Sequence, residues 1–191
     1  MRDRRLALAG DRDHVTTELL RKGFRHNRHP SSKNRSPHRS GVNRTGGSPF
    51  VEDYRGAIEA ALESLGEEQV RRRLVSSATT LLGLVKHVTW MQRVWFEECV
   101  GGMSRGELGL VQSPGESFRL ADDDTIASVT AAHREACVTA RRVVADLSLD
   151  AVVTGHRGGP RTLRWVYLQV LRELAQHCGH ADILREQLLV D

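Results

Sequence analysis

Apolar side chains recur every three or four positions through most of the chain after Pro49, which is the spacing of one face of an α-helix. The first such stretch covers residues 52–74 and is rich in Ala, Glu and Leu. Its apolar positions are Tyr54, Ile58, Ala61, Leu62 and Leu65. We expect one amphipathic helix here, ending near Gly66, because glycine commonly terminates helices.

A second helical pattern covers residues 79–100. Hydroxyl residues that could cap its N-terminus are Ser76, Ser77, Thr79 and Thr80. Its apolar face is formed by Leu81, Leu84, Val85, Val88, Trp95 and Cys99. The pair Gly101-Gly102 predicts the end of this helix.

The rest of the chain predicts a long loop and two further helices. Residues 101–121 form the loop, and the carboxylates of Asp122–Asp124 then suit the N-terminal end of a helix dipole. The buried stripe of this third helix is Ile126, Val129, Ala136, Ala140, Val143 and Leu147. Glycines and Pro160 break the chain before a final helix of about seven turns over residues 162–189.

No segment alternates with a period of two for long enough to predict a sheet. Four helices joined with one long crossover predict an all-α four-helix bundle over residues 49–191. A chain of 191 residues suits one core of ordinary size. The apparent brevity of the first helix would leave the bundle less stable or dependent on a partner, such as a second copy in a homodimer.

Residues 1–48 differ in character from the rest. Residues 1–50 hold 12 Lys and Arg against 4 Asp and Glu, whereas the remaining residues carry a net charge of −4. The stretch 21–48 is nearly empty of large apolar side chains, so we expect a disordered basic extension that is dispensable for the fold. An electrostatic arm for nucleic acid is the competing interpretation, and the lack of interleaved aromatic side chains makes it the weaker one.

Composition also bounds the compartment. No stretch approaches the ~18 to 20 apolar residues of a membrane span, and the apolar run near the N-terminus is too short for a signal peptide. The three cysteines, Cys99, Cys137 and Cys178, are odd in number and widely spaced, which is typical of reduced thiols. We therefore expect a soluble cytoplasmic protein that does not bind membranes.

Two of the predicted helices carry side chains able to bind a metal. Glu173 and His177 are four residues apart on the final helix, a spacing from which both can reach one cation, and His180 follows three residues later. His87 lies among apolar residues of the second helix and needs a buried polar partner or a metal. By spacing alone, a hydrogen-bonded core histidine and a solvated Glu–His pair explain the same pattern.

The amino-acid sequences of two segments give further information. TTLLGLVKHV with Trp95-Phe96, and LRWVYLQVLRELAQHCGHADILRE, resemble the DinB superfamily, in particular its actinobacterial branch of mycothiol-dependent S-transferases. The resemblance covers residues 62–189 and includes ESFRLADDDT. It implies a DinB-like four-helix bundle that binds a divalent metal, with a His on the second helix and two residues four apart on the last.

Carried to this chain, the resemblance implies that His87, Glu173 and His177 are the metal ligands. His180 is then expected beside the site or as the alternative ligand, and Gln169 stands where many relatives have His. Two nitrogen donors and one oxygen donor favour Zn or Ni. Outside the site, we expect His133 and His156 to lie at the surface.

The expected function is a metal-dependent transfer of a small thiol, by resemblance mycothiol, to small electrophiles in detoxification. An open metal site favours the thiolate of a bound thiol, and the protein's own cysteines fall on core stripes or off the ligand face. The alternatives are a non-catalytic metal-binding or stress-response module and a metal-dependent hydrolase.

Overall fold

The computed structural model describes residues 48–190, and its first helical region is interrupted. Helix α1 covers Pro49–Ala60, with Pro49 in its first turn, where the missing N–H costs nothing. The chain then turns through Ser64, whose φ of 63° is left-handed, and the short helix α2 covers Glu67–Arg71. The prediction of a single helix ending near Gly66 is therefore wrong. Leu62 and Leu65, which were predicted on its apolar face, reach the core from the turn after Ala60.

Helix α3 covers Leu81–Arg93 and continues into a π-helical segment, Val94–Val100. The side chain of Thr80 caps α3 by accepting a hydrogen bond from the Gly83 N–H at 3.0 Å. A π-helical turn holds more residues than an α-helical one, so side chains beyond Arg93 are turned relative to the α3 face.

A long crossover joins α3 to α5, as predicted, but it contains a short helix. Helix α4 covers Pro114–Ser117 and is capped by Ser113, and α5 covers Ile126–Val144 and is capped by Thr125. The three aspartates, Asp122–Asp124, directly precede the N-cap of α5, as predicted, but they do not bond its N-terminus. Asp124 instead pairs with Lys86 at 2.5 Å, and the helix N-terminus at Ile126 is satisfied by the Glu67 carboxylate at 2.9 Å.

The connection to the last helix is a small hairpin. Strand β1 (Val152–Val153) pairs antiparallel with β2 (Arg161–Thr162), in the register Val152↔Thr162. Helix α6 follows directly and covers Leu163–Val190, close to the predicted range. The two-residue strands were not predicted, since they are too short to show a period of two.

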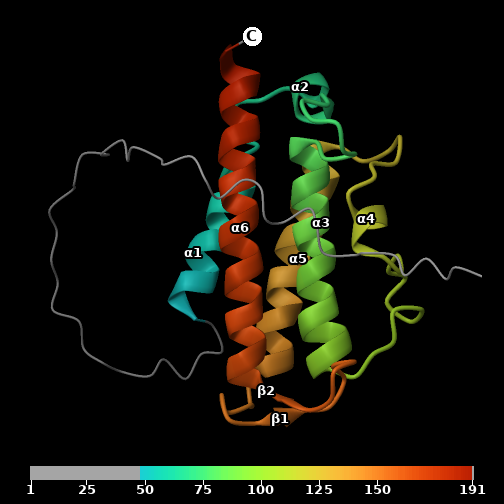
Figure 1. Ribbon diagram of the computed structural model, residues 1–191, viewed down its shortest axis with the longest axis vertical. Coiled ribbons are helices and arrows are strands. Elements are labelled where there is room, and N and C mark those ends of the chain that lie inside the picture. The colour runs from blue at the N-terminus through green and yellow to red at the C-terminus, as the bar shows by residue number, and fades with distance from the viewer. Residues whose placement is uncertain (1–47, 191) are drawn as a thin grey trace, which may run out of the picture. The chain divides into compact units, whose positions relative to one another are not determined.

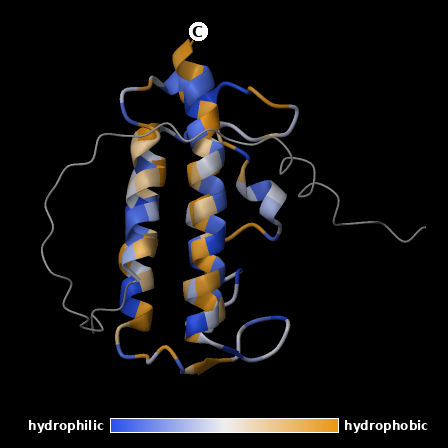
Figure 2. Cartoon of the chain, turned by 60° about the vertical axis from the view of Figure 1, so that its left-hand side comes forward, coloured by the Kyte–Doolittle hydropathy of each residue, from blue (hydrophilic) through white to orange (hydrophobic). Residues whose placement is uncertain are grey.

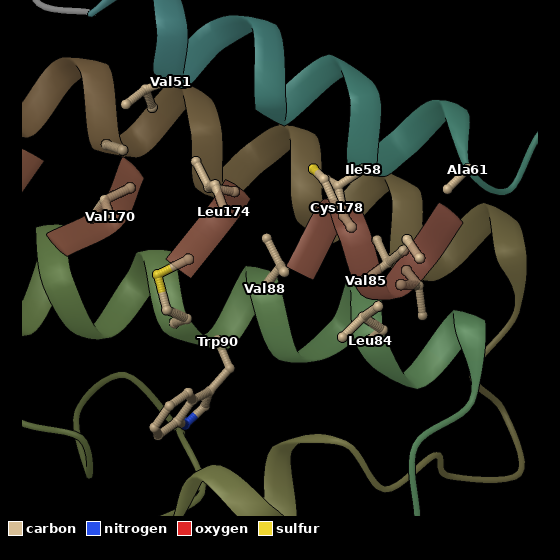
Figure 3. Close-up of a cluster of buried hydrophobic side chains, with 14 of the residues drawn as sticks. Val51, Ile58, Ala61, Leu84, Val85, Val88, Trp90, Val170, Leu174 and Cys178 are labelled. Atoms are coloured by element: carbon tan, nitrogen blue, oxygen red, sulfur yellow. The ribbon is translucent and has the colours of Figure 1, made fainter. Parts of the chain in front are cut away.

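The four main helices pack around one core (Figure 1). Helix α3 packs against α5 and α6, and α1 packs against α6. Each helix carries hydrophobic and hydrophilic residues along its length (Figure 2), and the apolar side chains of α1, α3 and α6 meet in the interior (Figure 3). The all-α bundle predicted from the sequence is confirmed. Leu147 was predicted in the buried stripe of the third helix, but it lies beyond the end of α5 and is exposed.

None of the helices within residues 48–190 combines the length and the apolarity that crossing a bilayer requires. The extension predicted to be disordered, residues 1–48, lies outside the described residues except for Ser48.

Candidate functional site

Two buried histidines face each other across the α3–α6 contact. His87 on α3 and His177 on α6 are 5% and 8% exposed, and their Nε2 atoms are 3.1 Å apart. The two rings meet edge to face, with centroids 4.7 Å apart. The fold thus brings together two residues 90 positions apart in the chain, with a nitrogen of each ring facing the other.

A serine of the crossover sets the protonation of His87. The Ser117 hydroxyl donates to the Pro114 carbonyl at 2.6 Å, so its oxygen accepts from His87 Nδ1, which lies 2.7 Å away. With the proton on Nδ1, the Nε2 of His87 carries a lone pair directed toward His177. Metal-binding histidines are commonly oriented by such a hydrogen bond from the second ring nitrogen.

Aromatic rings hold the His87 imidazole in place. The Phe118 ring stacks on it with centroids 3.9 Å apart and planes 11° apart, and the Trp90 ring stacks at 5.8 Å. Trp90 extends from α3 toward the crossover (Figure 3), where its indole N–H donates to the Val111 carbonyl at 2.9 Å. The crossover therefore covers His87 and limits its access to water.

This cover requires a glycine on α3. A Cβ atom at Gly83 would come within 2.5 Å of the Phe118 carbonyl oxygen, which is closer than nonbonded atoms approach. Only glycine allows the backbone at residue 118 to lie this near the helix. One turn further along α3, His87 meets the Phe118 ring as a result.

The third predicted ligand lies beside the pair. The Glu173 Oε2 atom is 3.8 Å from His177 Nε2, and its Oε1 accepts from Arg172 at 3.1 Å. His180 is also close, with its ring centroid 5.7 Å from that of His177. Gln169 lies two helical turns before His177, about 12 Å along the axis, and so does not belong to the imidazole pair.

Burial keeps both imidazoles neutral. Burial and, to a smaller extent, the neighbouring His177 together lower the pKa of His87 to about 3. The pKa of His177 is also lowered by burial, while the Glu173 carboxylate acts in the opposite direction. A neutral imidazole has the free lone pair that a metal needs, and the Nδ1 of His177 is buried without a hydrogen-bond partner among the described residues.

The pair fits a transition-metal ion in one measurable respect. Nitrogens bound to one Zn²⁺ at about 2.0–2.1 Å lie roughly 3.0–3.4 Å apart, which matches the distance between the two Nε2 atoms. Within residues 48–190, no three His, Cys, Asp or Glu side chains form a complete ligand group as they stand. The structure thus holds two assembled nitrogen donors with a carboxylate near one of them.

The two histidines predicted at the surface differ in their burial. His133 was predicted at the surface but is 1% exposed, with its Nε2 3.3 Å from the Arg55 carbonyl. Its neighbours in the sequence, Ala132 and Arg134, are exposed, but the His133 side chain itself is covered by α1 and α3, which pack against it. His156 is partly exposed in the hairpin loop, where it stacks on Trp95, so only the prediction for His133 was wrong.

All three cysteines are buried, and burial raises the pKa of each thiol. For Cys178 the value rises to about 11. Its Sγ lies 3.5 Å from the Tyr54 carbonyl oxygen and points toward α1 beside Ile58 (Figure 3). It is therefore turned away from His177, as its position in the helix predicts.

Comparison with known families gives a match that covers most of the chain. The model that describes mycothiol-S-transferase matches residues 48–189, nearly the range from Pro49 to Val190 that the helices span. The chain belongs to the mycothiol-S-transferase family. This confirms the resemblance inferred from the sequence. A comparison with curated proteins found no match.

In this member of the mycothiol-S-transferase family, sequence reasoning found the imidazoles but missed the residues that position them. Ser117 and Phe118 were assigned to the long loop over residues 101–121, with no role in the site. A usable signal was present, because Ser113 and Glu116 form a capping box, which predicts that a helix starts at Pro114. That the helix docks on α3 was not visible in the sequence.

Proposed function

We propose that this protein joins the thiol of mycothiol to a small electrophile, with a divalent metal held by His87, His177 and Glu173. The observation that carries the proposal is the pair of buried, neutral imidazoles with facing Nε2 atoms, in a chain of the mycothiol-S-transferase family. When bound, a metal ion supplies positive charge that favours a thiolate over a thiol. Two nitrogen donors with one carboxylate suit Zn or Ni.

The chain's own residues would prepare this site before any ligand enters. Ser117 holds the proton on Nδ1 of His87, so that Nε2 is ready to bind. Phe118 and Trp90 fix the plane of the imidazole and cover it. Glu173 needs only a side-chain rotation to complete the ligand set, since its carboxylate lies 3.8 Å from His177 Nε2.

The thiol would come from the cosubstrate and not from the protein. The three cysteines are buried with raised pKa values, so each is mostly protonated and poorly nucleophilic near neutral pH. In the transfer, the thiol sulfur forms a bond to carbon of the electrophile. The electrophile loses a leaving group, opens a strained ring or takes up the released thiol proton.

Metal content and conjugation should be measured together on the full chain. We expect wild-type protein to contain about one metal ion per chain, and His87→Ala, His177→Ala and Glu173→Ala to lose metal and thiol conjugation together. His156→Ala is the control for metal content alone and should retain the metal, because His156 lies outside the imidazole pair. If His180→Ala loses the metal while Glu173→Ala keeps it, the oxygen ligand is wrong and His180 takes its place.

The same experiment addresses the competing functions. A metal-loaded protein that consumes no mycothiol with a panel of epoxides, halides and activated alkenes contradicts the proposed transfer. Hydrolysis of such a panel without thiol consumption would indicate a metal-dependent hydrolase. Metal-free protein with full transfer activity would exclude the role given to the imidazole pair.

A further inference from the structure

A cluster of aromatic side chains lies at the hairpin end of the α3–α6 contact. Trp95 and His156 stack with centroids 5.7 Å apart and planes 9° apart, and Trp165 meets both rings edge to face. The Arg161 guanidinium lies 5.1 Å over the Trp165 ring. All four side chains are partly exposed, so a ligand can reach part of each.

The cluster and the histidine pair share the same two helices. Trp165, Gln169, Glu173 and His177 follow one another at four-residue spacing, which forms a single ridge on α6. This ridge meets α3 and its π-helical extension at both ends, through His177 with His87 and through Trp165 with Trp95. Trp165 and Glu173 are about 12 Å apart along the helix axis.

Local structure builds the cluster. Trp95 lies in the π-helical segment, and such segments are frequent at functional sites because they redirect side chains. The hairpin loop reaches Trp95 through Gly155, where a Cβ atom would come within 2.6 Å of the Cys99 carbonyl oxygen. His156 Nδ1 accepts from the Gly158 N–H at 3.0 Å, so in the neutral ring Nε2 carries the proton and is a donor.

The chemistry of the cluster suits a hydroxylated saturated ring. The C–H faces of such a ring pack on an indole, while its hydroxyl groups need hydrogen-bond partners at the edge. Here the partners are the guanidinium of Arg161, the Nε2–H of His156 and the amide of Gln169. A purely apolar electrophile would leave these groups unpaired.

We propose that Trp95, His156 and Trp165, with Arg161 and Gln169, bind the carbohydrate end of the thiol cosubstrate. This inference rests on the proposed function, because mycothiol is a cysteinyl group on an aminosugar linked to inositol. The ring end would stack on the cluster, and the cysteinyl arm would follow the α6 ridge toward Glu173 and His177. Gln169, which is not among the proposed metal ligands, lies between Trp165 and Glu173 on this path.

The test is a direct binding measurement that needs neither metal nor catalysis. The full-length protein, treated with chelator, is titrated by calorimetry with the thiol-free pseudodisaccharide of mycothiol, glucosamine linked to inositol. We expect wild-type protein to bind it, and Trp165→Leu and His156→Ala each to weaken binding on the order of ten-fold. Leu168→Ala is the control, because Leu168 is exposed on the same helix between Tyr167 and Gln169. It should bind as wild type does.

His156→Ala changes a partly exposed loop residue and decides the matter if Trp165→Leu does not fold. Kinetics supply a second readout: both variants should raise KM for mycothiol and leave KM for N-acetylcysteine, which lacks the rings, unchanged. Equal effects on both thiols would show a merely structural role and overturn the proposal. So would wild-type protein that does not bind the pseudodisaccharide.

The two proposals fail in different ways. Binding of the pseudodisaccharide that depends on Trp165, in a protein without transferase activity, sinks the proposed function and supports the carbohydrate site. Transferase activity with mycothiol that is indifferent to both substitutions sinks the carbohydrate site and leaves the proposed function standing.

Discussion

Ser117 is the residue that makes His87 a directed donor. Its hydroxyl is used toward the Pro114 carbonyl, so it accepts from Nδ1 and leaves the lone pair on Nε2. Removing this acceptor frees the ring to adopt the other tautomer and to rotate. The effect should fall on metal affinity more than on stability.

We predict that Ser117→Ala lowers metal affinity by about 10- to 100-fold with little loss of helicity. Competition against a chelator of known affinity measures this. Ser104→Ala, an exposed serine of the same crossover, is the control and should bind metal as wild type does. Unchanged affinity in Ser117→Ala would show that the hydrogen bond does not matter for the imidazole pair.

His133 has a different role, in the stability of the core. Burial lowers its pKa, so the folded protein keeps it neutral, whereas the unfolded chain binds a proton below its ordinary value of about 6.5. Its contribution to stability is therefore full above that value and is lost as the pH falls below it. His87 and His177 act in the same direction in the metal-free protein.

We predict that the free energy of unfolding of metal-free protein falls from about pH 7.5 to about pH 5, by up to ~1.4 kcal/mol per pH unit for each buried histidine. His133→Gln should be less stable at the higher pH but show a shallower fall. Denaturant unfolding at several pH values measures both. A slope in His133→Gln equal to that of wild type would mean that His133 does not stay neutral in the fold.

At the scale of elements, the site depends on how the crossover docks on α3. Helix α4 has only one turn, yet it places Ser117 and Phe118 on His87 because Gly83 admits the Phe118 backbone. The bundle itself is held by contacts elsewhere, among α1, α3, α5 and α6. Docking of the crossover can therefore be lost while the bundle persists.

We predict that Gly83→Ala displaces the crossover and weakens metal binding, while far-UV circular dichroism retains the helical signal. Gly56→Ala is a matched control on an exposed position of α1, where a Cβ atom has nothing within 4 Å. It should leave metal binding intact and stabilise the protein by up to ~1 kcal/mol, because alanine favours the helix. Normal metal affinity in Gly83→Ala would show that the docked crossover is not needed.

At the scale of the whole molecule, the cysteines are spread over three helical segments and buried in each. Cys99 lies in the π-helical segment, Cys137 in α5 and Cys178 in α6. Cys178, the cysteine next to His177, donates to the Tyr54 carbonyl and therefore points away from the imidazole pair. A reaction that uses an external thiol should not need them.

We predict that a variant with all three cysteines changed to Ala or Ser keeps its metal and much of its thiol transfer, with a loss of stability from imperfect packing. Chelation should abolish the transfer in this variant as in wild type. Elemental analysis and initial rates measure both. Loss of activity in Cys178→Ala alone, at unchanged metal content, would assign the chemistry to the protein's own thiol.

Local patterns sufficed for much of the architecture. The spacing of Leu81, Leu84 and Val88, and the cap at Thr80, are properties of one segment and its neighbours, so they can be predicted without the fold. The end of the first helix was predicted too late. The apolar residues around Ser64 keep helical spacing along the sequence, so the pattern does not reveal the left-handed turn there.

What the sequence by itself determined is therefore the all-α class, the family, and the residues Glu173, His177 and His87 as candidates for one site. Only the tertiary structure decided that His87 and His177 aim Nε2 atoms at each other, that Ser117 sets the tautomer and that His133 is buried. Helical periodicity tells which face of a helix is apolar, because neighbouring positions share one axis. It carries no information on which distant segment covers that face, because that depends on the docking of whole helices and on the path of the loops between them.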